Sequence, residues 1–287
     1  MSNEAPKNIP KKTVKKSVKS ERGKTVLAIL YYCIWAFVSV IASELIIGYL
    51  MIWILGPERF NKPVWTAVYS AVAYTMALLL TIFVPIALKK KKSGFKKLKD
   101  AKVTDVHKEK VKRKLLKTET RIELGLAGLP TWSDIALAPI GYIVSLVLAT
   151  GLVTLFSLFP WFDAEEAQNV GFSLYMSGFD RMIAFLTLVV LAPIAEEIIF
   201  RGWLYGKIRD KLNGKMKDIW GMAISILIVS VLFGLIHMQW NVGVNVFALS
   251  VVLCGLREVT GTIYAGILTH MIKNGVAFFL LYVVGMQ

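Results

Sequence analysis

The chain has 287 residues, 56% of them hydrophobic, and a mean hydropathy of +0.59. Several apolar runs reach the ~20 residues that a helix needs to cross a bilayer, which excludes a water-soluble protein and predicts an integral membrane protein. The net charge of +15 would suit nucleic acid, but the basic residues cluster beside the apolar runs, in 7–24, 89–121 and 207–217. Cytoplasmic loops carry this excess, and such segments attract anionic lipid. We therefore expect membrane lipid as a partner and no nucleic acid.

The apolar runs predict an all-α protein, a polytopic transmembrane bundle of about seven spans that encloses an intramembrane cavity. The positions of the basic segments favour a cytoplasmic N-terminus and the plasma membrane as the location. The chain divides into a basic cytoplasmic tail, two N-terminal spans, a basic cytoplasmic loop and a membrane core, at 1–25, 26–88, 89–133 and 134–287. The predicted spans cover residues 26–55, 64–88, 134–159, 183–206, 219–237, 243–257 and 262–285.

Two of these segments carry further expectations. Residues 1–24 are polar and rich in lysine, so we expect them to be disordered in water. The apolar stretch 243–257 has only ~15 residues, which is short for a crossing of ~30 Å. A connection over residues 238–242 that dips into the membrane would explain the short stretch, because irregular backbone is tolerated where it lines a cavity.

Three of the predicted spans contain polar groups that lipid should not tolerate. A charge at the centre of a membrane helix costs roughly 2.5–3.5 kcal/mol on insertion scales, so an ionisable residue there indicates a functional site by default. Two of the three histidines in the chain belong to this group. The residues are Glu196, Glu197 and Arg201 in the fourth span, His237 at the end of the fifth, four residues after the apolar Phe233, and His270 and Asn274 in the seventh.

The spacing in the fourth span predicts different roles for its two carboxylates. Residues four apart share a face of a helix, so Glu197 can form an ion pair with Arg201. Glu196 points about 100° away on the same helix and is left to face a cavity. A carboxylate in that position is suited to taking a proton from water.

The histidines and the amide supply the remaining groups for hydrolysis. His237 or His270 would hold the water with Glu196. The other histidine, together with Asn274, would donate hydrogen bonds to the oxyanion of a tetrahedral intermediate. These groups can hydrolyse a peptide bond without a nucleophilic side chain.

Other protease classes lack their signatures in this chain. There is no HExxH, no GxSxG and no pair of aspartates within the spans, as zinc, serine and aspartyl proteases would require. A divalent metal such as zinc is compatible with the ligand types present, and the sequence does not separate it from metal-free activation of water. The candidate metal ligands are Glu196, His237 and His270.

The motifs Glu-Glu-x-x-x-Arg at 196–201, Phe-x-x-x-His at 233–237 and His-x-x-x-Asn at 270–274 resemble those of the CAAX-protease and bacteriocin-processing (CPBP) family. Its members include type II CAAX prenyl endopeptidases and bacterial abortive-infection proteins. The resemblance covers roughly residues 120–285. It implies that residues 134–287 form a CAAX-protease-like intramembrane peptidase core.

The resemblance also implies roles for the motif residues. Glu196 would be the general base together with His237, and cleavage would take place near the cytosolic side. Some relatives have lost motif residues and act as scaffolds, whereas this chain keeps them all. In the same pattern, His270 and Asn274 would form the oxyanion site, and Glu197, Arg201 and Phe233 would give structural support.

The expected function is that of a membrane endopeptidase, a hydrolase of the glutamic or metallo type that acts in protein maturation. Its substrate would be a membrane-associated peptide or protein, including a lipidated one, a bacteriocin precursor or a signal peptide. One alternative is a non-catalytic bacteriocin-immunity or scaffold protein that binds a peptide or a partner. Another is a transporter that uses the buried Glu and His groups as a proton relay.

Overall fold

The computed structural model describes residues 11–86, 121–166, 172 and 177–285. Their regular structure is helical and contains no strand, which confirms the predicted all-α class. A helix pairs its backbone polar groups within one segment, and lipid offers them no other partner. The predicted basic loop 89–133 lies mostly outside the described residues.

The first two spans form a hairpin. α1 (Lys11–Leu55) is followed by the one-turn α2 (Pro57–Phe60), and α3 (Pro63–Leu78) then returns beside α1 and ends in the π-helical η1 (Leu79–Phe83). A proline opens both α2 and α3, where its missing N–H would have had no helical partner. The prediction of a disordered tail was wrong for residues 11–24, because α1 already begins at Lys11.

The other spans begin at α6 (Trp132–Phe156), which opens with a capping box between Thr131 and Asp134. A continuous helical rod then covers residues 178–212. It consists of α7 (Gly178–Phe185), η2 (Leu186–Leu191), α8 (Ala192–Glu197), η3 (Ile198–Leu204) and α9 (Tyr205–Leu212). The last helices are α10 (Asp218–Leu235), α11 (Trp240–Thr260), α12 (Tyr264–Phe279) and η4 (Leu280–Val284).

Among the described residues, seven helical segments are long and apolar enough to cross a membrane, as predicted. The sixth is α11, which has 21 residues, so the prediction of a short stretch at 243–257 was wrong. Its first turn contains Asn241, which falls in the connection predicted over residues 238–242. That side chain is only 8% exposed, and its amide donates a hydrogen bond of 2.7 Å to the carbonyl of Glu166. The connection before α11 is therefore reduced to residues 236–239.

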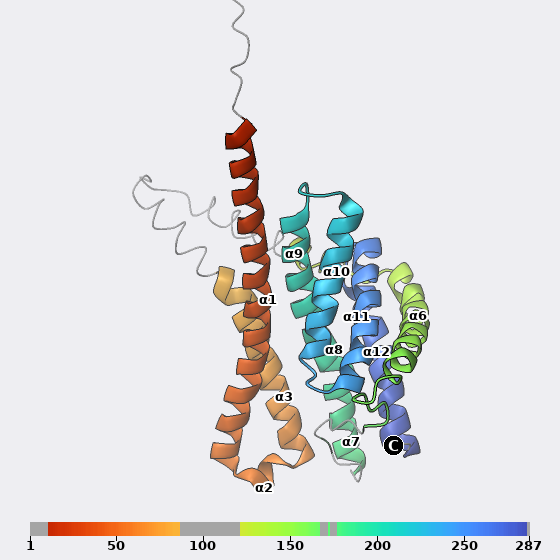
Figure 1. Cartoon of the computed structure of the whole chain (residues 1–287). Helices are drawn as coiled ribbons and strands as arrows, with labels where there is room; N and C mark the ends of the chain where they lie inside the picture. Colours follow the sequence, from red (N-terminus) through yellow and green to blue (C-terminus); the bar gives the residue numbers. More distant parts are fainter. Residues whose placement is uncertain (1–10, 87–120, 167–171, 173–176, 286–287) are drawn as a thin grey trace, which may run out of the picture.

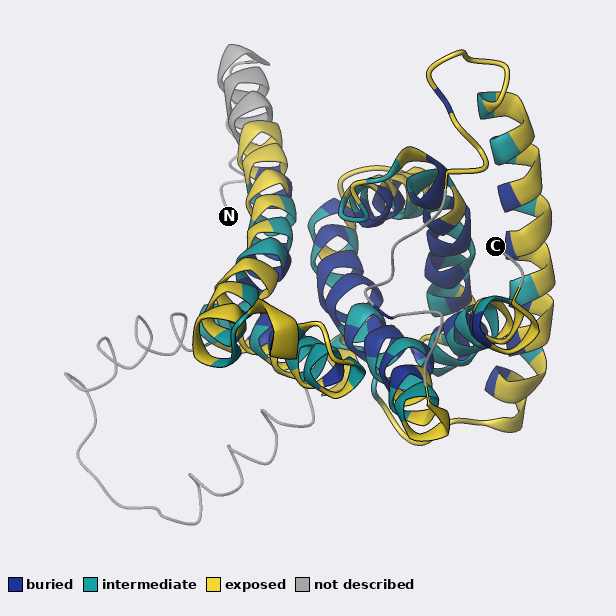
Figure 2. Cartoon of the chain, turned by 90° about the horizontal axis from the view of Figure 1, so that it is seen from below, coloured by how far each residue is buried: buried dark blue, intermediate teal, exposed yellow. Residues whose placement is uncertain are grey.

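The helices are arranged as a hairpin beside a bundle. Figure 1 shows α1 and α3 at one edge of the molecule and α6 at the other, with the rod, α10, α11 and α12 between them. In the view along the helices, the hairpin stands against one side of this bundle, and α6 covers the opposite side (Figure 2). α6 packs on α11 and α12.

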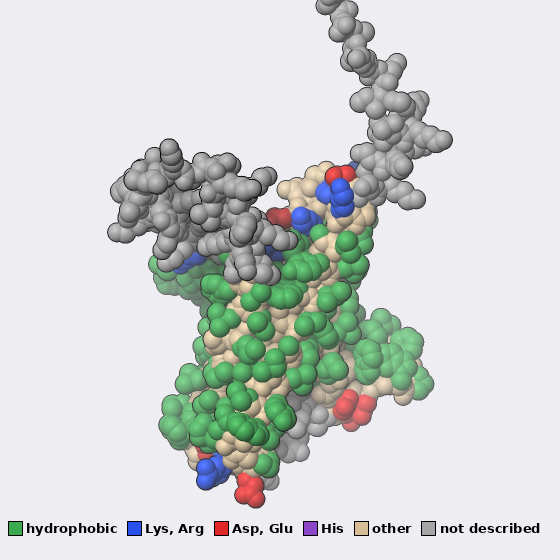
Figure 3. Space-filling model, turned by 90° about the vertical axis from the view of Figure 1, so that its left-hand side faces the viewer, with side chains coloured by type: hydrophobic (Ala, Val, Ile, Leu, Met, Phe, Trp, Pro, Cys, Tyr) green, Lys and Arg blue, Asp and Glu red, His purple; other side chains and the backbone are tan. Residues whose placement is uncertain are grey.

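Charged side chains gather at the ends of the helices. At one end, which we call the basic end and which contains residues 21–25 and 207–218, Lys215 lies 4.0 Å from Glu21 and Lys207 lies 3.0 Å from Glu123. Between the ends, the face of the molecule drawn in Figure 3 is covered mainly by hydrophobic side chains. An apolar surface of this extent suits lipid rather than water, so the chain is an integral membrane protein.

The hydrophobic core lies between the rod and α10. Phe200 and Leu204 of the rod and Val229 and Phe233 of α10 are all fully buried. Their packing fixes the positions of two elements that carry the candidate site residues.

Candidate active site

The Glu196–Glu197 pair lies between two π-helical segments, η2 before it and η3 after it. Pro193, at the start of α8, lacks a backbone N–H, and π-helical turns are one way in which a membrane helix re-pairs the carbonyl that a proline frees. Such segments occur frequently at functional sites. The rod is therefore distorted on both sides of the two carboxylates.

Glu197 is the centre of a buried ionic group. Its Oε1 lies 2.9 Å from Nη1 of Arg201, and neither side chain is exposed. The predicted ion pair is therefore present. The same oxygen accepts a hydrogen bond of 3.1 Å from Nδ1 of His270 on α12. Gly266 allows α12 to come this close, because a Cβ there would lie 3.2 Å from Oε2 of Glu197. Glu197 thus orients a histidine as well as an arginine.

Phe233 packs between the two histidines and the arginine. The guanidinium of Arg201 lies 4.3 Å from the centre of its ring, a distance at which a cation is attracted to an aromatic face. The rings of His237 and His270 meet it edge-on, at centroid distances of 5.1 Å and 6.0 Å. This buried ring fixes the spacing of the groups around it.

His237 lies in the turn between α10 and α11. Its Nδ1 donates a hydrogen bond of 2.8 Å to the carbonyl of Phe233, so Nε2 is the nitrogen left for other partners. The turn is tight, and Met238 has a positive φ of 55°, which is uncommon for a residue other than glycine. Figure 1 shows that this turn stops short of the level reached by α2 and α7.

Two glycines bring α10 and α11 together next to this turn. A Cβ on Gly234 would lie 2.8 Å from the carbonyl oxygen of Gly243, closer than real side chains approach. Small residues let membrane helices pack at such short distances. The position of His237 therefore depends on the absence of a side chain at Gly234.

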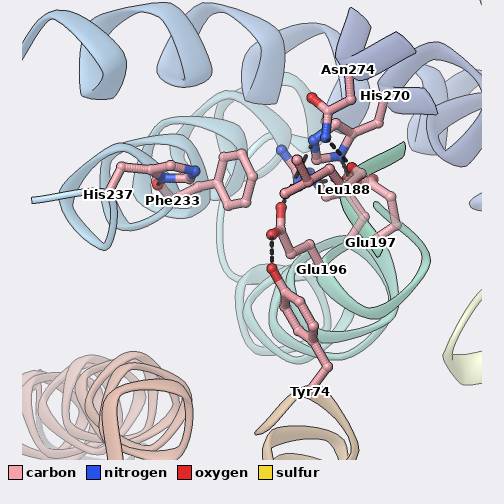
Figure 4. Close-up of polar contacts among 9 residues, drawn as sticks. Tyr74, Leu188, Glu196, Glu197, Phe233, His237, His270 and Asn274 are labelled. Carbon is pink, nitrogen blue, oxygen red and sulfur yellow. Dashed lines mark hydrogen bonds and ion pairs between the residues drawn. The ribbon is translucent and has the colours of Figure 1, made fainter. Parts of the chain in front are cut away.

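Glu196 faces a cavity of about 400 Å³. Its Oε1 accepts a hydrogen bond of 2.8 Å from the hydroxyl of Tyr74 on α3, and its Oε2 lies 3.8 Å from Nε2 of His270 (Figure 4). The four candidate catalytic residues and three further polar side chains all line this cavity. They are Glu196, His237, His270 and Asn274, with Glu44, Tyr74 and Lys273.

The pairing inside the cavity differs from the predicted one in two respects. His270, rather than His237, lies next to Glu196; in Figure 4 the ring of His237 lies apart from both, beyond Phe233. The Asn274 amide donates a hydrogen bond of 2.9 Å to the carbonyl of Leu188 in η2. One of its two amide hydrogens is thus used within the protein, and the other is left for a ligand.

The sequence was compared with models of known protein families, with curated proteins and with solved structures. Residues 178–276 match the family model described as type II CAAX prenyl endopeptidase Rce1-like. The chain carries an Rce1-like domain. The match agrees with the resemblance of the three motifs, and the matched family is one of CAAX-type intramembrane proteases. The chain matches no curated protein and no solved structure.

The Rce1-like domain does not by itself provide every wall of the cavity. Tyr74 and Glu44 come from the α1–α3 hairpin, outside the matched residues, and the sequence assigned no chemistry to either. A tyrosine in an apolar helix is ordinary, so no signal could have revealed Tyr74. Lys273 could have been recognised from the sequence, because a lysine in the middle of a span is energetically costly. No role was predicted for it.

A metal ion does not fit the residues of the Rce1-like domain as they are arranged. Zinc is held by three or four converging nitrogen, sulfur or oxygen ligands. Over the part of the chain that the structure describes, no group of three or more His, Cys, Asp or Glu side chains is placed to hold a metal ion. His237 lies too far to one side of Glu196 and His270 to complete such a set (Figure 4). The hydrolytic chemistry of the site is therefore assigned to its side chains alone.

Proposed function

We propose that the protein is an intramembrane endopeptidase in which Glu196 activates a water molecule. The observation that carries the proposal is the 3.8 Å separation between Oε2 of Glu196 and Nε2 of His270 at the wall of the cavity. A water molecule can bridge two polar groups that are too far apart for a direct hydrogen bond. Residues from α8 and α12 would thus hold the attacking water between them.

In the proposed first step, the water donates one hydrogen bond to Glu196 and the other to Nε2 of His270. His270 accepts because its Nδ1 carries the proton donated to Glu197. Both hydrogens are then directed to the protein, and an oxygen lone pair faces the scissile carbonyl. Glu196 takes the proton as the oxygen attacks the carbonyl carbon.

In the second step, the tetrahedral oxyanion collapses and the C–N bond breaks. The free amide hydrogen of Asn274 and the amino group of Lys273, which line the same space, stabilise the negative oxygen by donating hydrogen bonds to it. Glu196 then gives its proton to the leaving nitrogen. One water is consumed, and the two peptide products leave with their atoms balanced.

The cavity's surroundings support a membrane-associated peptide or protein as substrate. Its walls include Ile199, Phe200 and Leu281, and the helices around it present apolar side chains to lipid. A hydrophobic peptide, a lipidated one, a bacteriocin precursor or a signal peptide would share the chemistry that such a site recognises.

The test compares peptides released by membranes that contain the wild-type chain with those from the Glu196→Gln variant. Peptides that only the wild type produces are expected, with equal amounts of both proteins in the membrane. An immunity or scaffold protein that binds a partner without cleaving it would give identical profiles, and that result would refute the proposal.

We also propose an orientation, with the N-terminus in the cytoplasm of a plasma-membrane protein. The basic end contains Lys207 and Lys215, and positive residues favour the cytoplasmic side. The cavity is lined by Glu44 in the second half of α1 and by Tyr69 in the first half of α3, so it lies toward the other end. Substrate would then reach the site from the outer half of the membrane, unlike the cytosolic access that the family resemblance implied.

Cysteine labelling of intact cells tests this orientation, in a background without Cys33 and Cys254. Asn61→Cys, at the α2–α3 turn, should react with an impermeant maleimide from outside. Lys215→Cys, at the basic end, should react only after the membrane is opened. The reverse pattern would place the cavity toward the cytosol.

A further inference from the structure

The α1–α3 hairpin forms one wall of the cavity. Val40 and Glu44 of α1 and Ser70, Ala73 and Tyr74 of α3 line the same space as Glu196. Seen along the helices, the hairpin stands beside the helices of the Rce1-like domain (Figure 2). The cavity is therefore bounded by two parts of the chain, of which only one matches the family.

A hydrogen bond joins these two parts of the chain at the proposed base. The Tyr74 hydroxyl donates its hydrogen bond to Oε1 of Glu196 at 2.8 Å, across 122 positions of sequence (Figure 4). Hydrogen bonds to an ionised carboxylate are stronger than neutral ones. Both groups are partly buried, so water competes less for this bond than it would at an open surface.

This contact decides which way the carboxylate of Glu196 is turned. A glutamate side chain has several rotatable bonds, and ordering it has a cost in entropy. With Oε1 held by Tyr74, Oε2 is the oxygen that faces His270. That is the geometry in which a water can lie between Glu196 and His270.

We propose that Tyr74 is a positioning residue for Glu196, so that the active site is completed by the α1–α3 hairpin. The inference rests on the proposed function, because it assigns Tyr74 a role in the activation of water. Tyr74 would not touch the reacting atoms; it would hold the base in the orientation that abstracts the proton. A peptidase made of the Rce1-like segment alone would lack this group.

The chain offers a matched control on the same helix. Tyr69 also lines the cavity and lies on α3. Its hydroxyl donates a weaker hydrogen bond, 3.4 Å long, to the backbone carbonyl of Glu44, rather than to Glu196. Tyr69→Phe and Tyr74→Phe therefore remove the same atom from the same wall, and only one of them releases the proposed base.

The experiment uses the whole chain in detergent and the most rapidly cleaved member of a library of internally quenched peptides. Tyr74→Phe should lower kcat by about ten- to a hundred-fold, as expected for loss of a hydrogen bond to a charged group. KM should stay within about two-fold, because the side chain does not contact substrate. Tyr69→Phe should leave kcat within about two-fold of wild type, and any effect of this variant should be on KM, because Tyr69 lines the cavity without touching Glu196.

The split between kcat and KM separates positioning from a structural role. A residue that only shapes the cavity would raise KM, and one that only holds the hairpin in place would lower the thermal midpoint of unfolding. Either result, with kcat unchanged, would overturn the inference. If Tyr74→Phe does not accumulate in the membrane, Tyr74→Gln should retain more kcat than Tyr74→Leu, since Gln keeps a donor; equal values would also overturn it.

Failure of this inference can be distinguished from failure of the proposed function. If Glu196→Gln is inactive and Tyr74→Phe matches wild type, Glu196 acts without Tyr74, and only the inference falls. If Glu196→Gln cleaves as well as wild type, both the proposed function and the proposed role of Tyr74 are refuted.

Discussion

The Rce1-like segment and the α1–α3 hairpin meet at one cavity, but they hold their polar groups in different ways. The Rce1-like segment pairs its buried charges with one another: Glu197, Arg201 and His270 are in contact and are almost completely buried. The hairpin has no comparable group among its described residues, and its Tyr74 instead contacts a residue of the other segment. Changes in the first region should therefore remove activity or the fold, whereas changes in the second should adjust the rate.

The largest expected effect is at Glu196. Glu196→Gln keeps the shape of the side chain and removes the proposed base, so cleavage should fall by about a hundred- to ten-thousand-fold, measured with the quenched peptide. The purified protein should have a thermal midpoint close to that of wild type, because Glu196 faces the cavity rather than the core. A variant that loses cleavage only because it unfolds would not support a catalytic role.

The second largest effect is expected at Arg201, on the free energy of unfolding. Arg201→Met leaves Glu197 buried without its cation, and breaking a buried pair in this way costs about 3–5 kcal/mol. Unfolding in a denaturing detergent should show the loss. The hairpin offers a comparison in Tyr69→Phe, which should change the free energy of unfolding by no more than about 0.5 kcal/mol. An equal loss of unfolding free energy in Arg201→Met and Tyr69→Phe would contradict the proposed difference between the Rce1-like segment and the hairpin.

A smaller effect is expected where α10 and α11 touch. Gly234→Ala would push against the carbonyl of Gly243 and should cost about 1–3 kcal/mol as an overpacked contact. It should also lower kcat, because His237 lies three residues further along the chain, in the turn that this contact positions. Gly255→Ala on α11 is the control, since a Cβ there meets nothing within 4 Å; a similar loss in both variants would contradict the packing explanation.

The smallest expected effect comes from a chelator. Because Glu196, His237 and His270 do not converge as metal ligands, treatment with 1,10-phenanthroline followed by dialysis should leave the rate of cleavage unchanged. A loss of activity that added zinc restores would show that these side chains rearrange around a metal.

The contrast between the regions also explains what the sequence could predict. The spans and the motifs at Glu196, His237 and His270 were visible because charges in an apolar helix are costly and rare. The start of α11 was missed because residues 240–242 were assigned to the connection before the span, whereas the amide of Asn241 binds a carbonyl of another segment. The new partner of Asn274, the carbonyl of Leu188, depends on how two helices pack, and no local pattern encodes that.

Tyr74 shows that a residue outside the motifs also cannot be predicted from the sequence when its role depends on packing between helices. The three motifs say which residues a catalytic set contains, but a tyrosine on a separate hairpin carries no unusual cost and no motif. Its contact with Glu196 arises only when α3 packs beside α8. Contacts between distant segments of this kind are what the structure adds to the sequence.

The two π-helical segments also constrain how the rod can change in evolution. A π-helical turn holds more residues than an α-helical turn, since its hydrogen bonds join residues five rather than four apart. Loss of one residue from η3 would let that segment relax to an ordinary α-helix, and because the wider turn had held the extra residue, the helix after it would keep nearly the same rotation relative to the glutamates. Tyr205 and Arg209, which both bind Glu258 of α11, would then still point toward it. A change of one residue in length should therefore be tolerated better in η3 than in the α-helical parts of the rod.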